Sequence, residues 1–246
     1  MTANMPVSGS PLVIYCTFQN ASRSGLIGQV SGTVTYMARP RGFDEEAVLR
    51  AAREQFWATG YAATSIDDIL AVTGLGKGSL YGAFGDKHQL FVRVFNDYCD
   101  ETVASARAAL EGPDAEAYSR LCAHVRALAQ SIADDTELRG CLLAKGTAEL
   151  AGIDPVVGAC AQRTFQELTD VIVGCIEAAQ RAGDITATAV PADLAGLILA
   201  VERGMEALGK GGASADAVRA TAEAALALLH TPVAVSCPVP AGGVRG

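Results

Sequence analysis

Apolar side chains recur at helical spacing from residue 44 to about residue 230, and no run alternates as a half-buried strand does. The first stripe contains Val48, Ala52 and Phe56 and predicts a helix that begins after Asp44. Further stripes, interrupted by glycine or proline, bring the expected number to about nine helices. The pattern therefore predicts an all-α protein.

Short helices are expected first and longer ones afterwards. The second helix is predicted to begin at Thr64 or Ser65, with Thr64 as its cap, and Gly74 breaks it. A short helix over 77–84 follows, and a fourth begins near Asp86. The longer stripes lie between residues 121 and 229 and indicate a second, larger helical region.

Composition narrows the classes of protein that fit this pattern. The 246 residues are 50% hydrophobic with a net charge of −8, so any contact with nucleic acid must come from a local basic patch. No apolar run is long enough to cross a membrane. Seven cysteines without a C-x-x-C pair and three scattered histidines predict no metal site and no cofactor. Reduced thiols of this kind are typical of a cytoplasmic protein.

The two ends of the chain differ from its middle. Residues 1–36 contain one charged side chain, Arg23, and show no helical period, so they predict a disordered extension. We expect Met37 to be the true start of the folded chain. Proline and glycine from residue 231 onward predict a flexible tail over 231–246.

Residues 64–90 read TSIDDILAVTGLGKGSLYGAFGDKHQL, which is two short helices joined by a glycine-containing turn, a helix-turn-helix. This segment resembles the DNA-binding domain of the TetR/AcrR family of transcriptional repressors. The matching positions are Thr64, Ile66, Ile69, Gly74, Leu75, Lys77, Gly78, Leu80, Tyr81, Phe84, Lys87 and Leu90. The resemblance implies an N-terminal three-helix helix-turn-helix DNA-binding domain over 37–90. It also implies a larger C-terminal helical domain over 91–230 that binds a ligand and dimerises.

The helix over 77–84 is the expected recognition element. Leu80 and Phe84 are four residues apart and can face the core, which leaves the opposite side free for a DNA groove. Gly82 and Ala83 stand where relatives often carry larger side chains, so DNA shape is expected to contribute to specificity. The candidate DNA contacts are Arg39, Arg41, Thr64, Lys77, Gly78, Ser79, Tyr81, Gly82 and Lys87.

The second region is expected to hold a small-molecule effector and to form a homodimer through residues 191–229. Apolar stripes there, which include Met205 and Ala222, are rich in small residues and suit a seam between protomers. Ordinary packing within one chain is the alternative. The candidate pocket residues, each of which could instead be plain core, are Tyr98, Tyr118, Leu121, Val125, Phe165 and Leu168.

Cys141 follows Gly140 at a predicted helix start, where the helix dipole favours a thiolate and lowers the thiol pKa. Arg139 and Lys145 are close in sequence and could add to that effect. Residues 140–157 resemble a segment of one branch of the family, in which some members sense electrophiles or oxidants through this cysteine. A small buried hydrophobic side chain is the plainer interpretation.

These observations favour a DNA-binding transcriptional regulator that is not an enzyme. We expect a dimeric repressor that binds a palindromic operator on double-stranded DNA and is released by a small molecule. Two alternatives stay open: an all-α thiol enzyme such as a peroxidase using Cys141, and a helical ligand-binding protein that no longer reads DNA. The effector and the operator sequence are not encoded in any motif.

Overall fold

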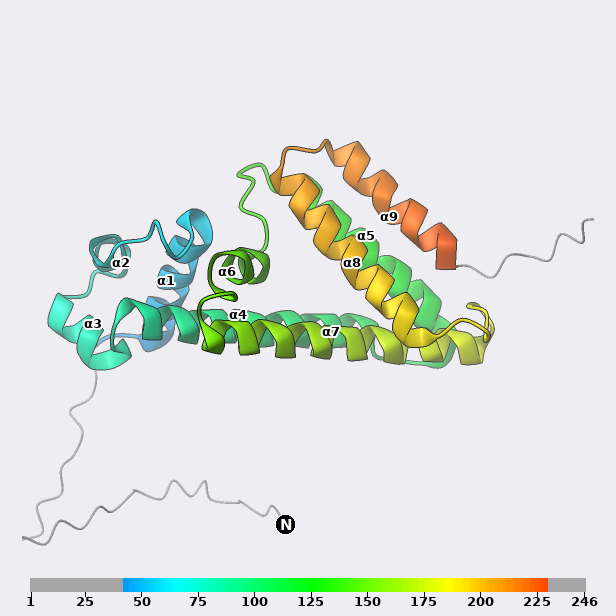
Figure 1. Cartoon of the computed structure of the whole chain (residues 1–246), viewed down its shortest axis with the longest axis horizontal. Coiled ribbons are helices and arrows are strands. Elements are labelled where there is room, and N and C mark those ends of the chain that lie inside the picture. Colours follow the sequence, from blue (N-terminus) through cyan, green and yellow to red (C-terminus); the bar gives the residue numbers. More distant parts are fainter. Residues whose placement is uncertain (1–41, 230–246) are drawn as a thin grey trace, which may run out of the picture. The chain divides into compact units, whose positions relative to one another are not determined.

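The computed structural model describes residues 42–229, and this part of the chain is helical without strands, as predicted (Figure 1). Nine α-helices and one 3-10 helix occupy it. Their bounds are α1 Glu45–Thr59, α2 Ile66–Thr73, α3 Lys77–Phe84, α4 Lys87–Leu110, η1 Asp114–Glu116, α5 Ala117–Asp134, α6 Leu142–Leu150, α7 Pro155–Ala182, α8 Pro191–Lys210 and α9 Ala215–Leu229. The expectations for residues 1–36, Met37, Arg39, Arg41 and 231–246 lie outside the described residues.

Short polar side chains fix where the first helices begin. The Asp44 carboxylate accepts a hydrogen bond from the backbone N–H of Ala47 at 3.1 Å, as expected for an N-cap. At α2 the cap is Ser65 rather than Thr64: the Asp68 N–H donates to Ser65 Oγ at 3.1 Å, and the Ser65 N–H donates to Asp68 Oδ2 at 2.8 Å. The sequence contained this capping box one residue after the predicted position.

The first three helices pack on the beginning of α4 through a small aromatic core. Phe56 of α1 and Phe91 of α4 meet edge to face, with ring centroids 5.1 Å apart. Ile69 of α2 and Leu80 of α3 are fully buried in the same cluster. This core holds α2 and α3 in a defined relation to α4.

Helix α4 runs through the predicted domain boundary at residues 90 and 91 without a break. Its first turn packs in the helix-turn-helix core, and the rest of it lies beside α7 (Figure 1). Leu90 and Cys99 are both fully buried on this one helix. One rigid element therefore belongs to both predicted domains.

Helices α8 and α9 pack on each other and on α5, which places Met205 and Ala222 inside one chain rather than in a seam. The dimer through residues 191–229 itself stays a prediction. Met205 is 0% and Ala222 is 1% exposed, so the predicted stripes form the core of a single chain. Three large apolar side chains of α8 and α9 remain exposed, and one of them, Leu208, belongs to the predicted stripe. They are Leu197, Leu208 and Leu228.

Candidate functional site

The turn between α2 and α3 is built around one glycine in a left-handed conformation. Gly74 ends α2 with φ +68°, and its N–H donates to the Leu70 carbonyl at 2.9 Å. Gly76 then caps α3 without a side-chain hydrogen bond. Because Leu80 and Phe84 are buried, the opposite side of α3 faces outward.

Five of the predicted DNA contacts are exposed on this one short helix. Lys77, Gly78, Ser79, Tyr81 and Gly82 are all exposed on α3, and the Tyr81 side chain is 40% exposed. The arrangement presents one ammonium group, two hydroxyl groups and two positions without side chains. A helix with these groups can lie in a major groove, with its polar side chains against phosphates.

Two other predicted contacts are committed to the fold itself. The Lys87 ammonium donates to the carbonyl oxygens of Tyr61 and Thr64, both at 2.8 Å, and lies 4.2 Å from the centre of the Tyr61 ring. Thr64 is 1% exposed, and its hydroxyl donates to the Gly60 carbonyl at 2.6 Å. These tertiary hydrogen bonds compete with the predicted phosphate contacts of the two side chains, which stay predictions.

A hollow of about 390 Å³ lies between α1, α4, α5, α7 and α8, with Cys141 just before α6 on its wall. Tyr98 and Leu168 line it as predicted. The other four predicted residues are not on its wall. Leu121 and Val125 are fully buried, Phe165 packs against the core, and the Tyr118 hydroxyl donates to the Leu226 carbonyl of α9 at 3.4 Å.

The polar lining of this hollow was missed from the sequence. It includes His124, Glu202, Arg203 and Glu206, with Trp57 of α1 on the same wall. Glu202 is 3% and Glu206 is 9% exposed. A signal was available, since both glutamates fall within the helical period of the apolar side of α8.

Cys141 lies on the wall of the same hollow with its side chain buried. Its sulfur is 3.6 Å from the Tyr98 hydroxyl and 3.6 Å from Nη1 of Arg203. Burial raises the pKa of the Cys141 thiol, and the nearby Glu206 raises it further. The predicted lowering of this pKa is therefore wrong.

The two cationic neighbours in the sequence do not face Cys141. Arg139 pairs with Glu54 at 2.5 Å, and Lys145 donates to the Trp57 carbonyl. A regulatory role for Cys141 stays a prediction, but these two cations do not support it.

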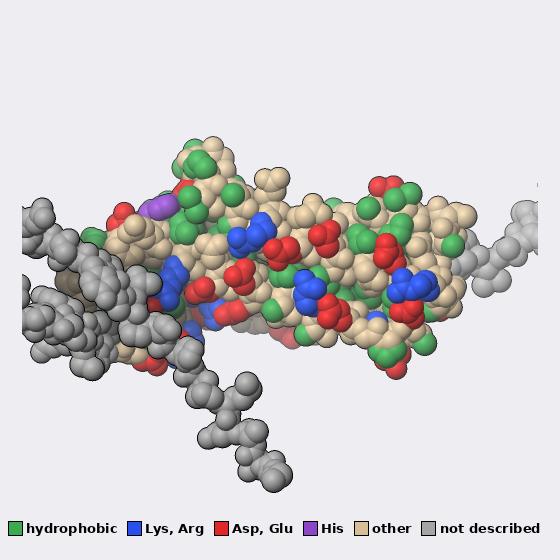
Figure 2. Space-filling model, turned by 90° about the horizontal axis from the view of Figure 1, so that it is seen from below, with side chains coloured by type: hydrophobic (Ala, Val, Ile, Leu, Met, Phe, Trp, Pro, Cys, Tyr) green, Lys and Arg blue, Asp and Glu red, His purple; other side chains and the backbone are tan. Residues whose placement is uncertain are grey.

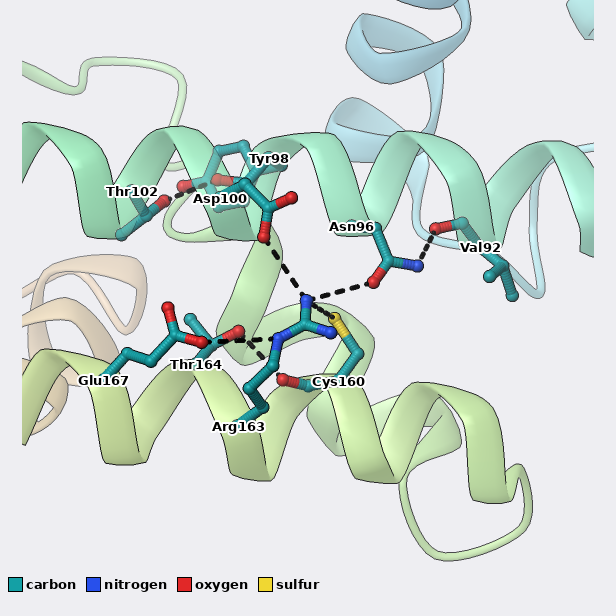
Figure 3. Close-up of polar contacts among 9 residues, drawn as sticks. All are labelled: Val92, Asn96, Tyr98, Asp100, Thr102, Cys160, Arg163, Thr164 and Glu167. Carbon is teal, nitrogen blue, oxygen red and sulfur yellow. Dashed lines mark hydrogen bonds and ion pairs between the residues drawn. The ribbon is translucent and has the colours of Figure 1, made fainter.

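Cys160 has the lowered pKa that was expected of Cys141. A hydrogen bond from the Cys99 thiol and the charge of Arg163 bring the pKa of Cys160 to about 7. Figure 3 shows Arg163 beside the Cys160 sulfur, with Nη2 at 3.7 Å, and the same guanidinium reaching Asn96 and Asp100 of α4. The position of Cys160 in the middle of α7 gave no sign of a lowered pKa, because Cys99 comes from α4.

Charged side chains elsewhere form mixed pairs. On the face seen in Figure 2, basic and acidic side chains are interspersed. Such pairs include Arg107 with Glu111 at 3.0 Å and Arg181 with Asp114 at 2.6 Å. Within residues 42–229, no cluster of three or more His, Cys, Asp or Glu side chains is placed to hold a metal ion. No helix there is long and apolar enough to cross a membrane.

The helix-turn-helix region and the larger helical region each match a known protein family. Residues 48–94 match the family described as bacterial regulatory proteins, tetR family, and residues 117–225 match a tetracyclin repressor-like C-terminal domain. This chain belongs to the TetR family of transcriptional regulators. Membership explains why a helix-turn-helix and a second helical region occur on one chain.

Curated TetR-type relatives include regulators from two bacteria. The transcriptional repressor ComR of Escherichia coli is 32% identical over 113 residues, which are 46% of this chain and 54% of ComR. The match thus spans about half the length of ComR. The uncharacterized regulator YezE of Bacillus subtilis is 26% identical over 153 residues, which cover 61% of this chain and 76% of YezE.

Solved TetR-family structures share the fold over most of the chain. A cysteine mutant of the regulator CifR, complexed with 26-base-pair double-stranded operator DNA, has a TM-score of 0.66 and 25% identity, covering 77% of this chain and 98% of CifR. A regulator from Chloroflexus aurantiacus has a TM-score of 0.65 and 27% identity, covering 74% of this chain and 91% of its own.

Proposed function

We propose that this TetR-family chain is a transcriptional repressor, not an enzyme, that binds double-stranded operator DNA as a homodimer. The observation that carries the proposal is the outward side of α3, where Lys77, Ser79 and Tyr81 stand beside Gly78 and Gly82. The CifR regulator, of similar fold, was solved with operator DNA. A regulator of this kind acts where bacterial DNA lies, in the cytoplasm.

We further propose that a small molecule in the hollow releases the DNA. Support comes from contacts that join the hollow to α1 of the helix-turn-helix region. The Trp57 indole N–H donates to the Gly140 carbonyl at 2.7 Å, and Arg139 binds Glu54 of α1. A ligand that favours a different position of Trp57 would shift α1, and with it α2 and α3.

A dimer through α8 and α9 is part of the same proposal, with a corrected surface. Leu197, Leu208 and Leu228 are 41%, 53% and 75% exposed. Small side chains surround them on the outward faces, including Ala200 and Ala224. A palindromic operator requires two copies of α3 related by a two-fold axis, which such a dimer supplies.

The test is binding of the full chain to duplex fragments tiled across the DNA that flanks its own gene. Fluorescence anisotropy over a salt titration should identify one fragment bound with high, salt-dependent affinity, and footprinting should locate a palindrome in it. Equal affinity for every fragment would refute operator recognition and favour the helical ligand-binding protein that no longer reads DNA. That alternative is suggested by the small side chains Gly82 and Ala83.

A further inference from the structure

The hollow beside α8 contains two buried acids whose oxygens are not all satisfied. Glu202 Oε1 and Glu206 Oε2 are buried atoms without a hydrogen-bond partner. Both side chains line the hollow of about 390 Å³. Burying a carboxylate oxygen without a donor costs free energy, so this pair is a place where a donor from outside the chain is stabilising.

The basic side chains near Glu202 and Glu206 do not fully neutralise the two carboxylates. Arg203 Nη1 lies 2.9 Å from Glu206 Oε2, as an ion pair without the geometry of a hydrogen bond, and Nη2 lies 3.8 Å from Glu202 Oε2. One guanidinium therefore faces two carboxylates. His124 Nε2 is 3.2 Å from Glu202 Oε1, without forming a hydrogen bond to it. Burial raises the pKa of Glu206, although the charge of Arg203 opposes the rise.

The second cation on the wall is already paired. Arg53 binds Glu101 at 2.6 Å, so these two charges cancel. An anion placed at Arg203 would meet both glutamates at close range, which is unfavourable in a buried site. The Nε–H groups of Arg53 and Arg203 also lack an acceptor, so the wall holds unpartnered donors as well as unpartnered oxygens. The lining nevertheless carries three carboxylates, those of Glu101, Glu202 and Glu206, against these two guanidinium groups. Its charge is therefore negative, which favours a cation over an anion.

The remaining walls are aromatic and apolar. The rings of Trp57 and Tyr98 meet edge to face at 5.3 Å, and Leu128 and Leu168 lie on the same lining. A second hollow of about 310 Å³ shares Trp57, Tyr98 and Leu128 with the first. Such walls suit the ring-containing part of a ligand, and aromatic faces also attract a cation.

We propose that the hollow binds an organic cation: a protonated amine or amidine, attached to an apolar ring system, whose N–H groups donate to Glu202 and Glu206. This proposal rests on the proposed release by a small molecule and names the chemical class of that molecule. It also explains why two acids occupy the otherwise apolar side of α8.

Three compounds with the same ring system and different charge test the proposal. They are biphenylmethylamine, biphenylmethanol and biphenylacetate. Trp57 is the only tryptophan of the chain and lines both hollows, so its fluorescence reports occupancy without any DNA present. We expect the amine to bind about tenfold more tightly than the alcohol, since hydrogen bonds to charged groups are the stronger ones. The acetate should bind most weakly.

Two variants test whether the glutamates cause the preference for the amine over the alcohol. Glu202→Gln and Glu206→Gln should each reduce the affinity for the amine about tenfold and leave that for the alcohol unchanged. Glu177→Gln, at an exposed position on α7, is the matched control and should change neither. Circular dichroism and melting temperature check that each variant is folded.

Three outcomes would overturn the proposal: acetate binding as tightly as the amine, no binding of the amine up to millimolar concentration, or full affinity for the amine in both glutamine variants. Each outcome is measured by Trp57 fluorescence in the absence of DNA. Failure of operator binding, measured separately, would instead overturn the proposed repressor function.

Discussion

Lys77 and Lys87 use their ammonium groups differently. Lys77 is exposed on α3, whereas Lys87 is held by the carbonyls of Tyr61 and Thr64. We expect Lys77→Ala to weaken operator binding and to reduce the slope of log affinity against log salt by about one, with an unchanged melting temperature. Lys87→Ala should lower stability by about 1 kcal/mol, because two partly buried acceptors lose their donor.

The two lysines are controls for each other. Salt titrations of operator binding and thermal melts of both variants distinguish their roles. A reduced salt slope with unchanged melting temperature for Lys87→Ala would show that Lys87 binds phosphate after all.

Gly82 has no role in packing within the chain. A Cβ added there would meet nothing within 4 Å, and glycine in a helix is about 1 kcal/mol less favourable than alanine. We expect Gly82→Ala to raise the melting temperature and to weaken operator binding, because a methyl group on the outward face of α3 keeps its backbone from the groove.

Gly174 in α7 is the matched control for this variant. It too has open space around its missing Cβ, in a helix far from α3 in the sequence. Gly174→Ala should raise stability equally and leave DNA affinity unchanged. Unchanged operator affinity in Gly82→Ala would mean that the backbone of α3 does not approach DNA at this position.

At the scale of single residues, the sequence predicted outward positions better than partners. Helical spacing sufficed to separate the buried Leu80 and Phe84 from the exposed Tyr81 and Gly82. It could not show that the Lys87 ammonium reaches carbonyls more than twenty positions earlier in the chain. The predicted direction of the Cys141 pKa shift was wrong for the same reason. Glu206 lies on α8, and side chains from other helices bury the thiol.

Helix caps also connect elements. Asp154 caps α7 by accepting from the N–H groups of Val156 and Val157, and it pairs with His88 of α4. The hydrogen bond from His88, followed by those from the backbone, lowers the pKa of Asp154. One carboxylate therefore joins the beginning of α7 to the beginning of α4.

The pH dependence of stability tests this connection. Because the folded pKa of Asp154 is below its unfolded value of about 3.9, its contribution is present above that pH and is lost as the pH falls through the folded value. Asp154→Asn keeps a good cap and removes the charge, so it should be less stable than wild type at neutral pH. The difference should vanish in acid. Denaturant titrations across this range would contradict the link if the difference were constant.

Two apolar faces on each of the last helices explain the error about the dimer. The stripe with Met205 and Ala222 is the more regular one, and it is used inside the chain. Leu208, at the end of the predicted stripe, lies instead among the exposed side chains. Hydrophobic periodicity finds the buried side of a helix, but it does not say which partner buries it.

The corrected face gives a direct test of the proposed dimer. Leu197→Glu with Leu228→Glu should raise the dimer dissociation constant by about two orders of magnitude and leave a folded monomer, since both side chains are exposed in one chain. Val156→Glu, also at an exposed apolar position, is the control. Sedimentation velocity measures the result. Met205→Glu should instead unfold the chain, and an intact dimer in the double variant would exclude this face.

At the scale of the whole molecule, the resemblance of residues 64–90 was enough to predict the family and the all-α fold. The hollow was not predictable in the same way, because Trp57, Tyr98 and Glu206 are far apart in the sequence and meet only in the fold. Only two of its six predicted lining residues were right. Helical spacing identified positions that are buried. It could not distinguish the residues that line a cavity from those packed in the core.

The proposed release of DNA requires that the two sites affect each other equally. If biphenylmethylamine lowers operator affinity by some factor, saturating operator must lower the affinity for the amine by the same factor, expected at about 5- to 150-fold. Trp57 fluorescence with and without operator measures one direction, and anisotropy of labelled operator measures the other. Unequal factors would mean that the amine acts at a site other than the hollow.

The route between the sites can be tested in the same titrations. Arg139 ties the segment before α6 to Glu54 of α1, and its guanidinium lies 4.4 Å from the centre of the Trp57 ring. Arg139→Gln should bring the coupling factor close to one while both ligands still bind. Arg126→Gln, which breaks the pair with Glu223 between α5 and α9, should leave the factor unchanged. Equal coupling in both variants would show that the connection to α1 runs through other contacts.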